Sequence, residues 1–109
     1  MRREEDESAE RPITVQIDED LKEIVPGFLA NRRRDVQTLE RAFKKNDLHA
    51  IHMIGHRLKG DGGGYGFDAI SVIGGVLEQA AAREDRDVIQ RQIAELVDFL
   101  ARVMVVYRR

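Results

Sequence analysis

After residue 18, hydrophobic residues recur every three or four positions along most of the chain, which is the spacing of amphipathic helices. Four long segments show this pattern: 26–45, 48 into the glycine run at 62–66, 68 to the charged turn at 83–87, and 87–107. Their inward-facing residues, in the same order, are Phe28, Leu29, Val36, Leu39 and Phe43; Ile51, Ile54, Leu58 and Tyr65; Ile70, Ile73, Val76, Leu77 and Ala80; and Ile89, Ile93, Leu96, Val97, Leu100 and Met104. Short connections between long helices favour antiparallel neighbours. We therefore predict an all-α fold, an up-and-down antiparallel four-helix bundle.

The segment before these helices is less regular. Asp18 is a good N-cap residue, and it predicts a short additional N-terminal helix. The apolar residues of that helix are Leu21, Ile24 and Val25. Residues 13–17 alternate like a strand, but without a second strand to pair with we expect an extended lead-in lying on the bundle. Residues 1–11 are almost all charged or small, which is typical of disorder. The predicted organisation is a flexible or extended segment over 1–17 and a helical bundle over 18–109.

The stretch 51–67, IHMIGHRLKGDGGGYGF, separates into two faces on a helical wheel of about 100° per residue. One face is the apolar stripe of Ile51, Ile54, Leu58 and Tyr65. The other face, which we expect to meet water, carries His49, His52, Met53, His56, Lys59, Gly60 and Gly63. A glycine inside a helix lowers its stability by about 1 kcal/mol relative to alanine, so the presence of Gly60 and Gly63 in this helix calls for a functional explanation. They flank the His56–Lys59 pair, where they leave room for the backbone of a partner or for a phosphoryl group.

Composition narrows the function classes. The 109 residues suffice for one domain with a modest core, and 42% of them are hydrophobic. A net charge of −2 argues against a general nucleic-acid binder. The absence of cysteine excludes disulfides and fits a reducing cytoplasm. No apolar run reaches the roughly 18 residues of a membrane span, and the charged N-terminus is not a signal peptide. We expect a cytoplasmic monomer that binds neither membranes nor nucleic acid.

Other candidate sites are weaker. His49, His52 and His56 have a spacing that could ligate a metal, but no carboxylate or cysteine completes the set on that face, so we predict no metal site. The basic run 32–34 is typical of a solvated helix face. Binding of a phosphate backbone is the alternative, although no aromatic or base-reading residues accompany the run. The role of Asp61 stays open.

The motif HRLKGDGGGYG, followed by FDAISVIGGVLEQA, resembles the signature of histidine phosphotransfer (HPt) domains of bacterial phosphorelays. In that family the phosphorylated histidine is followed by lysine three residues on, glycine four on, and small residues seven and ten on. The matching residues are His56, Lys59, Gly60, Gly63, Gly66 and Leu77–Glu78. The resemblance covers about residues 18–108. Two positions depart from it: Gly55, where the family more often has alanine, and Asp61, where a small neutral residue is usual.

The resemblance implies a phosphoryl carrier, not an enzyme with its own ATP site. His56 would accept a phosphoryl group from the aspartate of a receiver domain and pass it to another receiver. Lys59 would stabilise the phosphate, and His49, His52, Met53, Gly60 and Gly63 would form the docking surface. The partners would be receiver domains of response regulators or hybrid sensor kinases. We expect no cofactor in this chain, with Mg²⁺ on the partner receiver.

Two alternatives stay open. One is the phospho-accepting input domain of a chemotaxis-type histidine kinase, although this chain has no ATP-binding motif and the kinase would lie elsewhere. The other is a helical adaptor that binds receivers without being phosphorylated.

Overall fold

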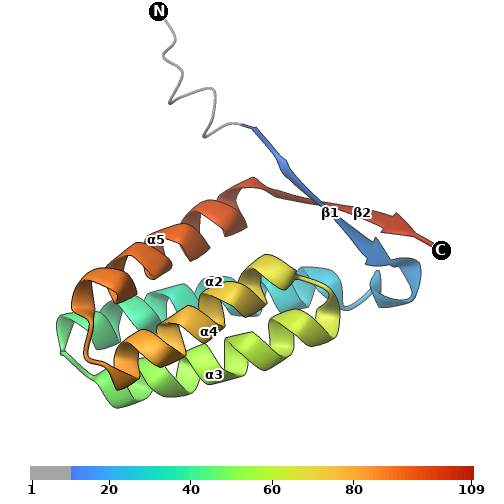
Figure 1. The fold of residues 1–109 in the computed structure, drawn as a ribbon. Helices are drawn as coiled ribbons and strands as arrows, with labels where there is room; N and C mark the ends of the chain where they lie inside the picture. Colours follow the sequence, from blue (N-terminus) through green and yellow to red (C-terminus); the bar gives the residue numbers. More distant parts are fainter. Residues whose placement is uncertain (1–10) are drawn as a thin grey trace, which may run out of the picture.

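The computed structural model describes residues 11–109 and contains four long helices (Figure 1). They are α2 (Val25–Lys44), α3 (Leu48–Tyr65), α4 (Asp68–Ala82) and α5 (Arg86–Arg102). Each helix packs against the next along the chain, and α5 also contacts α2, which closes the bundle. The closest pair is α3 and α4. The predicted four-helix bundle is confirmed. Within residues 11–109, no helix has both the length and the hydrophobicity to cross a membrane.

Side-chain caps begin helices α3 and α5, and a glycine ends α3. The Asp47 carboxylate accepts a hydrogen bond from the Ala50 backbone N–H at the start of α3, and Asp85 accepts one from Val88 at the start of α5. At the end of α3, Gly66 has φ of 87°, a left-handed conformation that favours glycine. The chain therefore reverses sharply between α3 and α4, and these two helices form an antiparallel hairpin.

Most of the predicted inward residues are buried, and Leu39, Ile51, Leu58, Leu77 and Leu96 are fully inaccessible. The prediction is wrong for Val97 and Met104, whose exposed fractions are 43% and 48%. Val97 lines an open groove of about 720 Å³ between α2 and α5, so its helix face is not covered there.

The C-terminal residues form a strand, and this overturns two predictions. Strand β1 (Ile13–Asp18) pairs in parallel with β2 (Val103–Arg108), from Ile13 opposite Val103 to Asp18 opposite Arg108. The expected unpaired lead-in over 13–17 is therefore wrong, as is the continuation of the last helix to residue 107. The sequence VMVVY is rich in β-branched and aromatic residues, which favour strands. Alternate side chains turn toward the bundle, namely Ile13, Val15, Ile17, Val103, Val105 and Tyr107. Met104 is exposed because it lies on the outer face of this ribbon.

The additional N-terminal helix is not confirmed. Its place is taken by a three-residue 3₁₀ turn (Glu19–Leu21), in which Asp18 accepts a hydrogen bond from the Asp20 N–H at 2.8 Å. Asp18 acts as a cap, but Ile24 remains 47% exposed and the next helix begins only at Val25. The disorder expected near the N-terminus concerns residues that lie, except for Arg11, outside those the structure describes.

Candidate functional site

His56 lies on α3 with its side chain 71% exposed, as the helical wheel predicts. Its Nδ1 atom is 2.7 Å from Oε2 of Glu78 on α4. The two residues are 22 positions apart, and the α3–α4 hairpin brings them together. His56 precedes the turn at Gly66 and Phe67 by about as many residues as Glu78 follows it.

Glu78 pairs with both candidate reactive residues, His56 and Lys59. Its side chain is 13% exposed, and its second oxygen, Oε1, lies 3.6 Å from Nζ of Lys59. The hydrogen bond with His56, and then the charges of His56, Lys59 and His52, lower the pKa of Glu78, although partial burial opposes this. At neutral pH the ionised carboxylate can only accept a hydrogen bond, so a neutral His56 ring donates from Nδ1. Nε2, on the other side of the ring, then carries the free lone pair.

Three glycines allow the backbones of α3 and α4 to touch beneath this site. A Cβ atom at Gly55 would lie 2.7 Å from the Glu78 backbone nitrogen, and one at Gly74 would lie 2.5 Å from that of Lys59. A Cβ atom at Gly62 would lie 2.5 Å from the Ser71 nitrogen. Gly60 differs, since nothing lies within 4 Å of the corresponding position. Gly55, Gly62 and Gly74 therefore allow the two helices to pack closely, whereas Gly60 leaves open space on the exposed side of α3.

The sequence from residue 23 to residue 104 matches the family model of the Hpt domain. The chain belongs to the Hpt domain family. Comparisons with curated proteins and with solved structures found no match. The matched range includes all four helices and both candidate reactive residues. This Hpt domain is thus a histidine phosphotransfer module of two-component signalling, and members of the family are phosphocarriers that interact with receiver domains.

The remaining predicted residues of the Hpt domain lie on α3 around His56. His49, Gly60 and Gly63 are exposed, Met53 is 57% exposed, and His52 is partly exposed. Within residues 11–109, no group of three or more His, Cys, Asp or Glu side chains is arranged to hold a metal ion. The predicted site residues thus all lie on α3 and are accessible, and the structure adds Glu78 from α4 to the candidate site.

Glu78 was not predicted as a site residue, although the sequence contains a usable signal. In an antiparallel helical hairpin, residues at equal distances from the turn face one another. The turn lies at Gly66 and Phe67, at the end of the glycine run, so Glu78, eleven residues after Phe67, faces His56, ten residues before Gly66. Helix periodicity alone does not give this pairing, because it describes one helix at a time.

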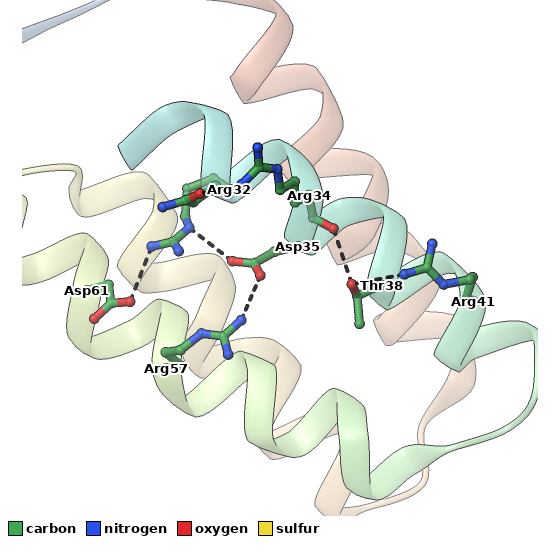
Figure 2. A network of polar contacts seen from close by, with 8 residues as sticks. Arg32, Arg34, Asp35, Thr38, Arg41, Arg57 and Asp61 are labelled. Carbon is green, nitrogen blue, oxygen red and sulfur yellow. Dashed lines mark hydrogen bonds and ion pairs between the residues drawn. The ribbon is translucent and has the colours of Figure 1, made fainter. Parts of the chain in front are cut away.

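The basic run of the Hpt domain is not simply a solvated face (Figure 2). Arg32 on α2 is only 7% exposed; its Nε lies 3.0 Å from Asp35 Oδ2, and its Nη1 lies 3.2 Å from Asp61 Oδ2 on α3. Arg57, also on α3, donates to Asp35 Oδ1 at 2.6 Å. The solvated interpretation is wrong for Arg32, whereas the other two arginines of the run are exposed. The open role of Asp61 is resolved: it pairs with Arg32 and ties α3 to α2.

Proposed function

We propose that this Hpt domain accepts a phosphoryl group on His56 from the phospho-aspartate of one receiver domain and passes it to another receiver. The observation that supports this most directly is the exposed imidazole whose Nδ1 is held by Glu78 at 2.7 Å. That hydrogen bond leaves Nε2 as the nucleophile and orients it away from the bundle. The ring therefore presents its reactive atom to an incoming partner.

In the forward step the Nε2 lone pair attacks phosphorus, the bond from phosphorus to the aspartate oxygen breaks, and that carboxylate leaves. The transition state of phosphoryl transfer is loose and in line, so positioning and charge stabilisation supply most of the catalysis. As the N–P bond forms, positive charge develops on the imidazole ring. Glu78 stabilises this charge through the Nδ1–H hydrogen bond. In the reverse step the same proton stays on Nδ1, so the ring departs from phosphorus as a neutral imidazole.

Lys59 provides the positive charge for the phosphoryl oxygens. Its side chain is 56% exposed and lies one helical turn after His56. Its ion pair with Glu78 is long, at 3.6 Å, and a pair this exposed is weak. The ammonium can therefore move to the phosphoryl group without a large loss elsewhere. In this proposal Mg²⁺ belongs to the receiver domain.

Docking of the receiver is assigned to the exposed part of α3 around His56. Met53 offers an apolar contact one turn before the histidine, and His49 and His52 extend that side. On the other side Gly60 and Gly63 carry no side chain that would keep a partner away, and the Cβ position at Gly60 faces open space. A receiver can thus bring its phospho-aspartate to Nε2 without displacing bulky groups.

The test is phosphotransfer from purified receivers that carry radiolabelled phospho-aspartate. Wild-type protein is expected to gain an acid-labile, alkali-stable label, and His56→Gln is expected to gain none. Circular dichroism checks that the variant is folded, since the substituted side chain is exposed. Label retained by His56→Gln would overturn the assignment. Label that appears only with an ATP-binding kinase domain would indicate the chemotaxis-type input domain, and receiver binding without label would indicate an adaptor.

A further inference from the structure

His52 lies on α3 one helical turn before His56, and Lys59 lies one turn after it. Residues three or four positions apart on a helix are neighbours on its surface, with Cβ atoms about 5–6 Å apart. Side chains of a helix lean toward its N-terminus, so the His56 ring is expected to lean toward His52. The side chain of His52 is partly exposed. The imidazole of His56 is therefore flanked along the helix by a histidine on one side and a lysine on the other.

The charge of His52 acts on the site through Glu78. The pKa of Glu78 is lowered first by the hydrogen bond with His56. The charges of Lys59 and His52 lower it further. Because the interaction between charges weakens with distance, the contribution of His52 indicates that its ring lies near this carboxylate. His52 therefore belongs to the same group of charges as the two candidate reactive residues.

The charges of the polar network lie on another side of α3. Arg57 and Asp61, which pair with residues of α2, are about 140° and 180° away from His52 around the helix. The charged or titratable residues around His52 are Glu78 on α4 and, on α3, His49, His56 and Lys59. Negative charge near His52 therefore comes from Glu78 and, after phosphorylation, from His56.

Phosphorylation of His56 would leave the site short of positive charge. A phosphoryl group carries a charge of about −1.5 to −2 at pH 7, and the ionised Glu78 adds another negative charge 3.6 Å from the Lys59 ammonium. Lys59 and a protonated His56 ring together do not balance these charges. A further cation beside the phosphoryl group therefore stabilises the phosphorylated form. Protonated His52 is such a cation, one turn away.

We propose that His52, when protonated, is a second phosphate-stabilising residue of this Hpt domain and favours the phosphorylated form of His56. Histidine is the side chain that ordinarily changes its charge between pH 5 and 8, so this contribution is present at pH 6 and is lost by pH 8.5. A lysine keeps its charge over the same range. Phosphorylation of His56 by a receiver rests on the proposed function, whereas the electrostatic effect of His52 does not.

The alternative is that His52 only contacts the receiver, and the equilibrium of transfer separates these two roles. A residue that acts only in docking changes the forward and reverse rates equally, because it does not alter the relative stability of the separated proteins. Their ratio, the equilibrium constant, then stays unchanged. A charge that stabilises phosphorylated His56 instead raises the equilibrium constant for transfer from the receiver.

The experiment measures this equilibrium constant with a radiolabelled phospho-receiver at pH 6 and pH 8.5. Dividing each value by that of His52→Gln at the same pH removes the titration of the other groups. We expect wild type to exceed His52→Gln about threefold at pH 6, the scale of an exposed ion pair, and to equal it at pH 8.5. His52→Lys should keep about a threefold advantage at both pH values.

His49→Gln is the matched control. It removes the same side chain from the same helix, but two turns from His56, and should keep the wild-type equilibrium constant at both pH values. Circular dichroism checks that the variants are folded. A wild-type equilibrium constant in His52→Gln at pH 6 overturns the proposal, as does an equal decrease in His49→Gln. An effect of the same size at both pH values also overturns it, because the charge of His52 would then not be the cause.

A chemical donor tests the electrostatic effect without a receiver. With potassium phosphoramidate, Nε2 attacks phosphorus, the P–N bond of the donor breaks, and ammonia leaves. The ³¹P signal of phosphorylated His56, identified by its absence in His56→Gln, reports the titration of the phosphoryl group. A neighbouring cation favours the dianion, so a threefold effect places the midpoint about 0.5 pH unit lower in His52→Lys than in His52→Gln. Equal midpoints overturn the proposal, whereas receivers that fail to label wild-type protein remove only the proposed function.

Discussion

Asp35 on α2 forms ion pairs with both Arg32 and Arg57, so its removal is expected to destabilise the bundle strongly (Figure 2). Asp35 is 8% exposed, and its carboxylate faces Arg57 at 2.6 Å and Arg32 at 3.0 Å. In Asp35→Ala the guanidinium of Arg32, itself 7% exposed, retains only Asp61 at 3.2 Å among these acids. A buried charge is thus left partly uncompensated.

The expected magnitude follows from the exposure of each partner. Removing one partner of a buried ion pair costs about 3–5 kcal/mol, whereas loss of an exposed pair costs about 1 kcal/mol or less. We expect about 3 kcal/mol for Asp35→Ala, at the lower end of that range, because Asp61 remains and Arg57 can turn to solvent. For a domain of this size the loss corresponds to a fall in Tm of about 12 °C. Asp61→Ala should cost about 1 kcal/mol or less, because its side chain is 40% exposed.

The assay is urea unfolding followed by circular dichroism, with the Arg32→Met/Asp35→Leu double variant as control. Replacing both buried charges by apolar side chains should recover most of the stability. The α3–α4 contacts at His56 do not involve Asp35, so the folded fraction of Asp35→Ala should be phosphorylated at the wild-type rate. A loss below about 1 kcal/mol for Asp35→Ala, or a double variant as unstable as the single one, would refute this reasoning.

Two further predictions concern the site itself. The pKa of Glu78 is lowered from 4.5, first by the hydrogen bond with His56, so its contribution to stability is present above pH 4.5 and is lost as the pH falls through the lower folded-state pKa. The difference in urea midpoint between wild type and Glu78→Gln should therefore be larger at pH 6 than at pH 3, and equal differences would contradict the pairing. Met53→Ala should weaken receiver binding about tenfold, because a 57% exposed methionine beside His56 offers apolar surface for burial. Isothermal titration calorimetry measures this, and an unchanged Kd would remove Met53 from the docking surface.

The helices and the accessible face of α3 could be predicted because both depend on local spacing. A period of three to four residues gives the buried side of each helix, and the opposite side follows without knowledge of the neighbours. The exposure of His56 and Lys59 is a property of this kind. Their position on one helix, one turn apart, needed no tertiary information.

What sequence reasoning missed depends on contacts between distant residues. Val103 and Met104 continue the helical spacing of Leu96 and Leu100, and only pairing with β1 makes the extended form favourable. Arg32 belongs to a charged run that is usually solvated, and its burial requires acids on two helices. Such partners are known only once the helices are placed side by side.

The parallel ribbon of β1 and β2 joins residues that are far apart in the chain, with Ile13 opposite Val103 (Figure 1). Closing a loop of that length is entropically unfavourable until the intervening helices have shortened the distance between its ends. We therefore expect β1 and β2 to pair late in folding, after the helices have assembled. Amide exchange in these two strands is accordingly expected to accelerate as soon as the helices loosen, before the bundle itself unfolds.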